Sequence, residues 1–236
     1  MKSTNFIIIT VIVVVLSPFL LWISNNPVLN IQLFDNSQYN ALLNYQLTVL
    51  ILAGAMIGIV VLLTQGRGLT FLNLTKTDGK ITPEPWIGIN PKPGESWKSQ
   101  GIIFSIIITM VTTGVIFFQV FRNGTFEMDF FPGLLLVVIF AVSNAFVEEI
   151  LFRFSFVSVG LDANVSRWIV QGFSALTFGL VHYFGIPSGI PGVLMAGSIG
   201  WLLSKSMIET QGFFWAWFIH FLQDAVSYTH LTLPTN

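Results

Sequence analysis

The apolar residues of the chain fall into seven long runs separated by shorter polar segments. The runs cover approximately residues 5–24, 47–64, 100–121, 131–157, 166–184, 191–207 and 211–226. A helix that crosses a bilayer needs about 20 mostly apolar residues, and each run approaches or exceeds that length. The pattern therefore predicts an all-α, polytopic membrane protein with about seven transmembrane helices.

The first run is either a signal peptide or a permanent anchor. Its stretch NFIIITVIVVVLSPFLLWI is long for a signal peptide, and no A-x-A cleavage site follows, so we expect an anchor. If the N-terminus is cytoplasmic, nine of the ten Lys and Arg residues lie in inner segments, and only Arg122 lies in an outer one. The positive-inside rule therefore predicts a cytoplasmic N-terminus.

The overall composition agrees with a membrane protein. Hydrophobic residues make up 53% of the 236 residues, charged residues only 9%, and the mean hydropathy is +0.77. A soluble domain usually has about 25% charged residues. The net charge of -1 gives no reason to expect nucleic-acid binding. The absence of cysteine excludes disulfides, thiolate metal sites and a cysteine nucleophile.

The longest polar segment, residues 65–99, divides the chain. It is rich in Gly and Pro (TPEPWIGINPKPGESW), which argues against a long helix. We interpret residues 1–99 as an accessory part with two transmembrane helices and a cytoplasmic loop at 65–99, and residues 100–226 as the core. Residues 227–236 form a polar tail that is either ordinary or an artefact resembling translated adapter sequence. His230 is therefore given no functional role.

Three of the predicted core helices carry ionisable side chains. A charge at the centre of a bilayer costs roughly 2.5–3.5 kcal/mol on insertion scales, and such groups usually face a cavity and serve function. Six ionisable side chains on three helices are hard to explain by chance or by packing alone. In chain order they are Glu148, Glu149, Arg153, His182, His220 and Asp224.

The fourth run carries two acids with different surroundings. Glu149 and Arg153 are four residues apart, share a helix face and can pair, which could be a purely structural contact. Glu148 points about 100° away and has no charged partner on its own helix. Asn144 lies one turn before Glu148 and could hydrogen-bond to it. Glu148 is therefore the candidate general base.

The two histidines allow different interpretations. His182 alone could be a packing histidine in an apolar helix. His220 and Asp224 are four residues apart on one face, so Asp224 could orient His220 or stabilise its protonated form. Because Asp224 lies near the outer end of its run, it could instead be solvated.

These groups suit hydrolysis of an amide bond. A Glu beside a His can hold and deprotonate a water molecule, and a second His can donate to the oxyanion that forms. Alternatively Glu148, His182 and His220 could hold a divalent metal such as zinc, with metal-bound water as nucleophile. The sequence leaves both open. It contains no H-E-x-x-H motif, no G-x-S-x-G motif and no paired Asp dyad.

Three motifs follow one another on the core helices: Glu148-Glu149-x-x-x-Arg153, Phe178-x-x-x-His182 and His220-x-x-x-Asp224. Their order and spacing resemble the signature motifs of the CPBP family, the CAAX prenyl protease and bacteriocin-processing (Abi) intramembrane endopeptidases. The resemblance covers roughly residues 100–226. The third motif of the family often ends in Asn, whereas this chain has Asp224.

The resemblance implies roles for these residues. Glu148 would be the catalytic base, and His182 would share its water. His220 and Asp224 would support the oxyanion, and Glu149 with Arg153 would form a structural pair. Family members are described as metalloproteases, and a metal-free glutamate mechanism is also argued for them, so a metalloendopeptidase remains one alternative.

We therefore expect an intramembrane endopeptidase of a bacterial cytoplasmic membrane that acts on a membrane-bound or lipidated peptide. One rival is a non-catalytic bacteriocin-immunity or partner-binding protein with the same fold. A second is a proton-coupled transporter in which Glu148 and the histidines form a relay. The sequence shows neither the internal repeat nor the paired interrupted helices that many transporters have.

Overall fold

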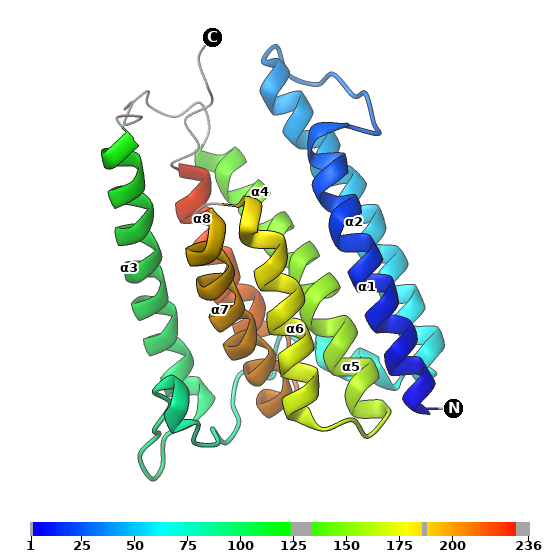
Figure 1. The fold of residues 1–236 in the computed structure, drawn as a ribbon, viewed down its shortest axis with the longest axis vertical. Coiled ribbons are helices and arrows are strands. Elements are labelled where there is room, and N and C mark those ends of the chain that lie inside the picture. Colours follow the sequence, from blue (N-terminus) through cyan, green and yellow to red (C-terminus); the bar gives the residue numbers. More distant parts are fainter. Residues whose placement is uncertain (1, 124–133, 186–187, 230–236) are drawn as a thin grey trace.

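The computed structural model describes residues 2–123, 134–185 and 188–229, which contain no β-strand and are mostly helical (Figure 1). The α-helices are α1 (Lys2–Asn25), α2 (Ser37–Thr64), α3 (Trp97–Asn123), α4 (Leu134–Glu149), α5 (Ser155–Asp162), α6 (Arg167–Val181), α7 (Gly189–Thr210) and α8 (Phe214–Thr229). The shorter helices are η1 (Arg67–Leu72), η2 (Pro85–Ile87) and η4 (His182–Phe184), which are 3-10 helices, and η3 (Ile150–Phe154), a π-helix. The predicted all-α class is confirmed.

The described residues of each predicted apolar run are mostly helical. Since α4, η3 and α5 follow one another without a break, the described residues form seven rods that run alternately up and down in Figure 1. Within the described part of the chain, four helical segments are long and apolar enough to cross a membrane: Ser3–Asn25, Ser37–Thr64, Trp97–Phe118 and Leu135–Asp162. α6 and α8 have only 15 and 16 residues. Length and hydropathy thus establish four candidate spans rather than the predicted seven.

The C-terminal boundary also differs from the sequence interpretation. We placed the start of the polar tail at residue 227, but α8 continues to Thr229. Tyr228 is therefore part of a helix, and its hydroxyl accepts a hydrogen bond from Gln46 on α2. His230 and the rest of the tail lie outside the described residues.

The two ends of α2 illustrate how local sequence sets the helix boundaries. The Asn36 side chain accepts hydrogen bonds from the backbone N–H groups of Gln38 and Tyr39, which satisfies two donors of the first turn. At the other end, Gln65 adopts a left-handed conformation with φ 55° and closes the helix. Gly66 follows with φ 81°, a conformation that glycine adopts at little cost.

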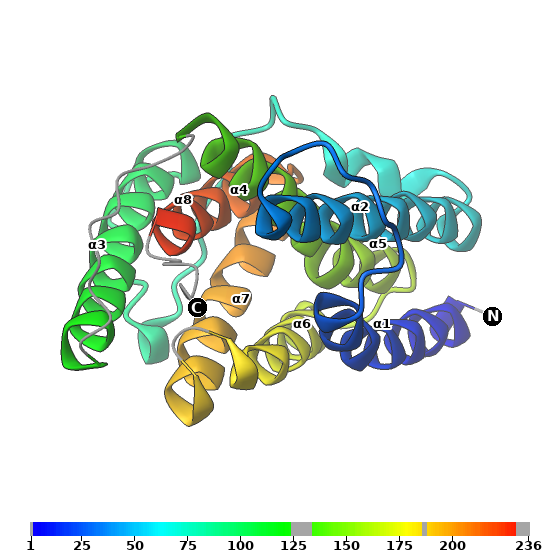
Figure 2. The same cartoon turned by 90° about the horizontal axis from the view of Figure 1, so that it is seen from above.

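The core rods are packed between α3 on one side and α1 and α2 on the other (Figure 2). α6 packs along α7, and small residues allow the close approach. A Cβ atom on Gly179 would lie 2.7 Å from the carbonyl oxygen of Val193, so only glycine fits there. α4 packs on α8, and α1 and α2 both pack on α5. α5 also packs on α6, so the rod of α4, η3 and α5 lies beside the two other rods that carry predicted motifs.

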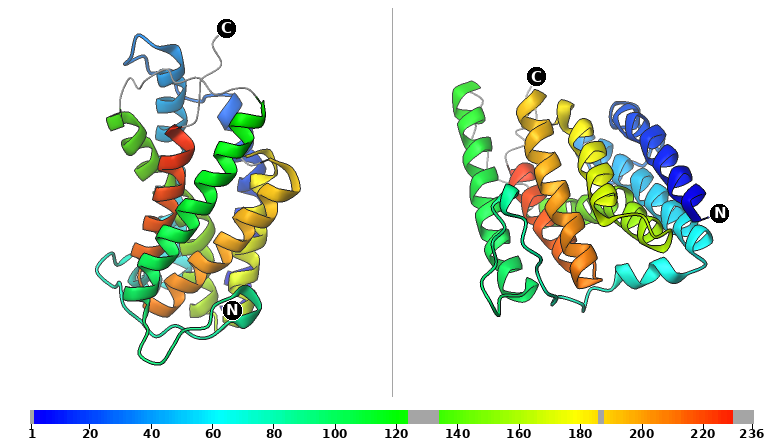
Figure 3. Two further views of the ribbon diagram at one scale, coloured as in Figure 1. Left: turned by 90° about the vertical axis from the view of Figure 1, so that its left-hand side faces the viewer. Right: turned by 60° about the horizontal axis from the view of Figure 1, so that its bottom comes forward.

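The polar segment between α2 and α3 is more ordered than the irregular linker that we predicted. It runs along the end of the bundle where α7 and α8 join (Figure 3, right). The Lys205 Nζ atom of α7 donates to Glu84 Oε1 at 2.9 Å, to Glu209 Oε1 at 2.7 Å and to Thr82 Oγ1 at 2.7 Å. Lys205 and Glu84 are each only 1% exposed. A buried ionic cluster thus fastens this segment to α7.

Candidate active site

The two adjacent acids lie where the rod changes its helix type. Glu148 and Glu149 are the last residues of α4, and the π-helical turn η3 begins directly after them. The backbone N–H of Ser155 donates to the carbonyl of Ile150, five residues back, which is the π pattern. Such wider turns occur often at functional sites because they rotate the following residues relative to an α-helix. The hydrophobic pattern did not predict this turn.

Glu149 joins two elements of the site. Its Oε1 atom lies 3.3 Å from Arg153 Nη1, which is the predicted pairing within one helix, and 2.6 Å from His220 Nδ1 on α8. Glu149 and Arg153 are both fully buried. The Arg153 guanidinium also lies 3.6 Å from the centre of the Phe178 ring. The contact between Glu149 and His220 was not predicted, since the sequence placed Asp224 behind that histidine.

Glu148 and Asp224 lie on the other side of the His220 ring. The Nε2 atom of His220 is 3.5 Å from Glu148 Oε2 and 3.6 Å from Asp224 Oδ1. The Asn144 amide donates to both acids, to Glu148 Oε1 at 3.0 Å and to Asp224 Oδ2 at 3.1 Å. The predicted hydrogen bond between Asn144 and Glu148 is therefore present. His220 has an acid facing each of its ring nitrogens.

His182 begins η4, directly after the last residue of α6. Its Nδ1 atom is 2.9 Å from the carbonyl oxygen of Phe178. A carbonyl oxygen only accepts hydrogen bonds, so Nδ1 carries the hydrogen, and the neutral ring offers Nε2 as an acceptor. The Phe178 ring contacts both histidines, with centroid distances of 4.2 Å to His182 and 5.4 Å to His220. Phe178 is thus a shared neighbour of the two imidazoles.

Glu148 and His182 share a cavity of about 170 Å³. Its wall includes Leu20 of α1 and Tyr45 of α2, so the part of the chain that we interpreted as accessory also borders this space. A water molecule occupies about 30 Å³ in the liquid, so the cavity has room for water and part of a larger molecule. Only 22% of the Glu148 side chain is exposed.

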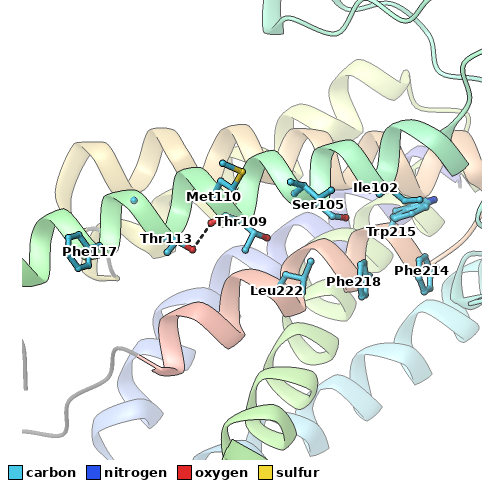
Figure 4. A pocket seen from close by; sticks show the side chains of 12 residues that line it. Ile102, Ser105, Thr109, Met110, Thr113, Phe117, Phe214, Trp215, Phe218 and Leu222 are labelled. Carbon is cyan, nitrogen blue, oxygen red and sulfur yellow. Dashed lines mark hydrogen bonds between the residues drawn. The ribbon is translucent and has the colours of Figure 1, made fainter. Parts of the chain in front are cut away.

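A larger groove of about 1050 Å³ lies between α3 and α8 and is mostly apolar (Figure 4). On α8 it is lined by Phe214, Trp215, Phe218 and Leu222. His220 lies two residues from both Phe218 and Leu222, which corresponds to about 200° around a helix. The groove therefore occupies the face of α8 opposite the candidate site.

The sequence left open a metal held by Glu148, His182 and His220. Among the residues that the structure describes, no group of three His, Asp or Glu side chains is placed to hold a metal ion. The Nδ1 contacts of His220 with Glu149 and of His182 with a backbone carbonyl leave both Nε2 atoms available. The three predicted side chains do not converge on one point, however, so the arrangement does not fit the predicted ligand set, and we derive no step through a metal.

Gln46 on α2 is the main contact residue that the sequence reasoning missed. It is 2% exposed, and its side chain donates to Asn144 Oδ1 at 3.3 Å. A polar residue at the edge of an apolar run was the available signal, but spacing along α2 does not indicate that this helix faces α4.

Comparison with known protein families gives a match that covers most of the core of the chain. Residues 130–226 match the family model of type II CAAX prenyl endopeptidase Rce1-like proteins. This segment belongs to the CPBP/CAAX protease family. The CAAX protease segment carries all three predicted motifs, and its family consists of intramembrane endopeptidases. Searches of curated proteins and of solved structures found no match for the chain.

Proposed function

We propose that the protein is an intramembrane endopeptidase that hydrolyses a peptide bond in a membrane-associated or lipidated peptide, using water activated by Glu148 and His182. The observation that carries the proposal is the shared cavity of Glu148 and His182, beside the buried set of Glu149, Arg153 and His220. The match of residues 130–226 to the CAAX protease family supports the same reaction.

Glu148 is the general base of the proposed reaction. Its Oε1 atom is held by Asn144, whereas Oε2 makes no hydrogen bond with the described residues. In the cavity, the Glu148 carboxylate takes a proton from a water molecule whose oxygen attacks the carbonyl carbon of the substrate. The Nε2 atom of His182 accepts the second hydrogen of this water and orients it. The attack gives a tetrahedral oxyanion.

His220 stabilises this oxyanion. Each of its ring nitrogens faces a carboxylate, so in the proposed reaction the imidazole is protonated on both. The Nδ1–H donates to Glu149, and the Nε2–H is directed towards Glu148 and Asp224, with which its contacts are long. The oxyanion provides a closer acceptor for this hydrogen. When the C–N bond breaks, Glu148 returns its proton to the leaving nitrogen, giving an amine and a carboxylic acid, which then ionises. The Glu149–Arg153 pair keeps the imidazole in place.

The proposed topology has seven membrane crossings with a cytoplasmic N-terminus in a bacterial cell membrane. The segment after α2 contacts two later turns at the same end of the bundle. Arg67 pairs with Asp162 at 2.6 Å, and the Phe213 N–H donates to the Asn73 carbonyl at 2.9 Å. An even number of crossings must therefore separate these turns, which supports α6 and α7 as a pair of spans.

The test of this proposal is the variant Glu148→Gln. Removal of a general base typically slows a reaction by about 10²–10⁴-fold, so cleavage of a membrane peptide should fall by at least about 100-fold. An immunity protein without catalysis would still protect cells from a bacteriocin after this substitution. A transporter would lose pH-dependent flux while no peptide is cleaved.

A further inference from the structure

Gln46 is a buried glutamine within a candidate membrane span, where an unpaired amide would be costly. Its polar atoms are paired. Nε2 donates to Asn144 Oδ1 at 3.3 Å and to the Tyr228 hydroxyl at 3.2 Å, and Oε1 accepts from Ser143 Oγ at 3.1 Å. The two hydroxyls can donate or accept, so the end of the Gln46 amide that faces Asn144 is set by Asn144 Oδ1, which needs a donor.

The orientation of the Asn144 amide decides how Glu148 and Asp224 are held. With Oδ1 bonded to Gln46, the Nδ2 group donates one hydrogen to each acid. If the Asn144 amide turned over, its carbonyl oxygen would face two carboxylates and make no hydrogen bond with them. The Gln46 Nε2 donor needs an acceptor opposite it, and Asn144 offers its Oδ1 atom there only when its Nδ2 group faces the two acids. The donor therefore favours this orientation of the Asn144 amide.

We propose that Gln46 is a positioning residue that locks the Asn144 amide, so that Asn144 bridges Glu148 and Asp224 and holds the Glu148 carboxylate in place. This role rests on the proposed function, in which Glu148 is the base. α2 then contributes to the site although it lies outside the CAAX protease segment. Gln46 does not line the cavity, so it acts through Asn144 and not through the substrate.

Two substitutions of Gln46 separate positioning from packing. Gln46→Met keeps the size but removes the donor, and loss of one hydrogen bond should lower kcat by about tenfold. An ionised Gln46→Glu side chain can only accept, so it attracts the Asn144 Nδ2 group and turns the amide over. This variant should lower kcat by about 100-fold, since both acids lose their donor. KM should stay unchanged in both.

The matched control is Gln171→Met on α6. Gln171 is also a buried glutamine, but its Nε2 atom has no hydrogen-bond partner among the described residues, so this variant should keep the wild-type kcat. Equal kcat values for Gln46→Met and Gln46→Glu, or a change confined to KM, would overturn the positioning role.

A double-mutant cycle on thermal unfolding in detergent tests the contact without any cleavage. Gln46→Met and Asn144→Ala should be non-additive in melting temperature, because each removes the same hydrogen bond. Additive effects would overturn the proposed lock, whatever the activity. If wild type cleaves nothing while coupling is present, the endopeptidase proposal and the catalytic role of Gln46 fail, and only the structural contact stands.

Discussion

At the scale of single residues, the candidate site depends on the fully buried carboxylate of Glu149. It has two partners of different kinds, the guanidinium of Arg153 and the imidazole of His220. A buried charge is tolerated when it is paired and is costly when its partner is removed. Glu149 therefore orients His220 and also contributes, through its pairing, to the stability of the bundle.

The substitution Arg153→Met tests this dependence. It leaves the Glu149 carboxylate without its guanidinium partner, so the free energy of unfolding should fall by about 3–5 kcal/mol. The double variant Glu149→Gln/Arg153→Met removes the charge as well and should recover much of that loss. Unfolding in detergent measures both. If Arg153→Met were as stable as wild type, Arg153 would not compensate the buried charge of Glu149.

At the scale of elements, the sequence predicted contacts within one helix but not contacts between helices. Asn144 with Glu148, and Glu149 with Arg153, are each four residues apart, so helical geometry alone brings them together. The contact of Glu149 with His220 depends on how α4 and α8 are rotated against each other, which spacing does not specify. The π turn η3 was also not predicted, because it breaks the regular period of the helix.

The segment between α2 and α3 provides the prediction at this scale. Lys205→Met would leave Glu84 and Glu209 buried without their shared cation, so this segment should detach from α7 and become more sensitive to chymotrypsin. Lys98→Met, at an exposed lysine near the start of α3, is the matched control and should digest at the wild-type rate. Equal digestion of both variants would contradict a structural role for the buried cluster.

At the scale of the whole molecule, the sequence predicted the class, the order of the apolar runs and the segment that carries the three motifs. It could not establish the number of crossings, since α6 and α8 are too short to be identified as membrane spans from their length. Their place in the bundle depends on packing against α7 and α4, and not on their own hydropathy.

The proposed topology can be mapped with single cysteines, because the chain contains none. Asn26→Cys, after α1, should react with a membrane-impermeant maleimide in intact cells. Lys92→Cys, in the segment between α2 and α3, should react only after the cells are permeabilised. Both native residues are exposed. The reverse labelling pattern would place the N-terminus outside the cell.

The central claim is that Glu148 activates water for hydrolysis of a peptide bond. The most direct measurement is cleavage of a fluorogenic membrane-peptide library by purified protein in detergent, with and without a chelator. Wild type and the loop variant Glu95→Gln should cleave alike, Glu148→Gln should be at least about 100-fold slower, and the chelator should have no effect. Cleavage by Glu148→Gln at the wild-type rate would contradict the account.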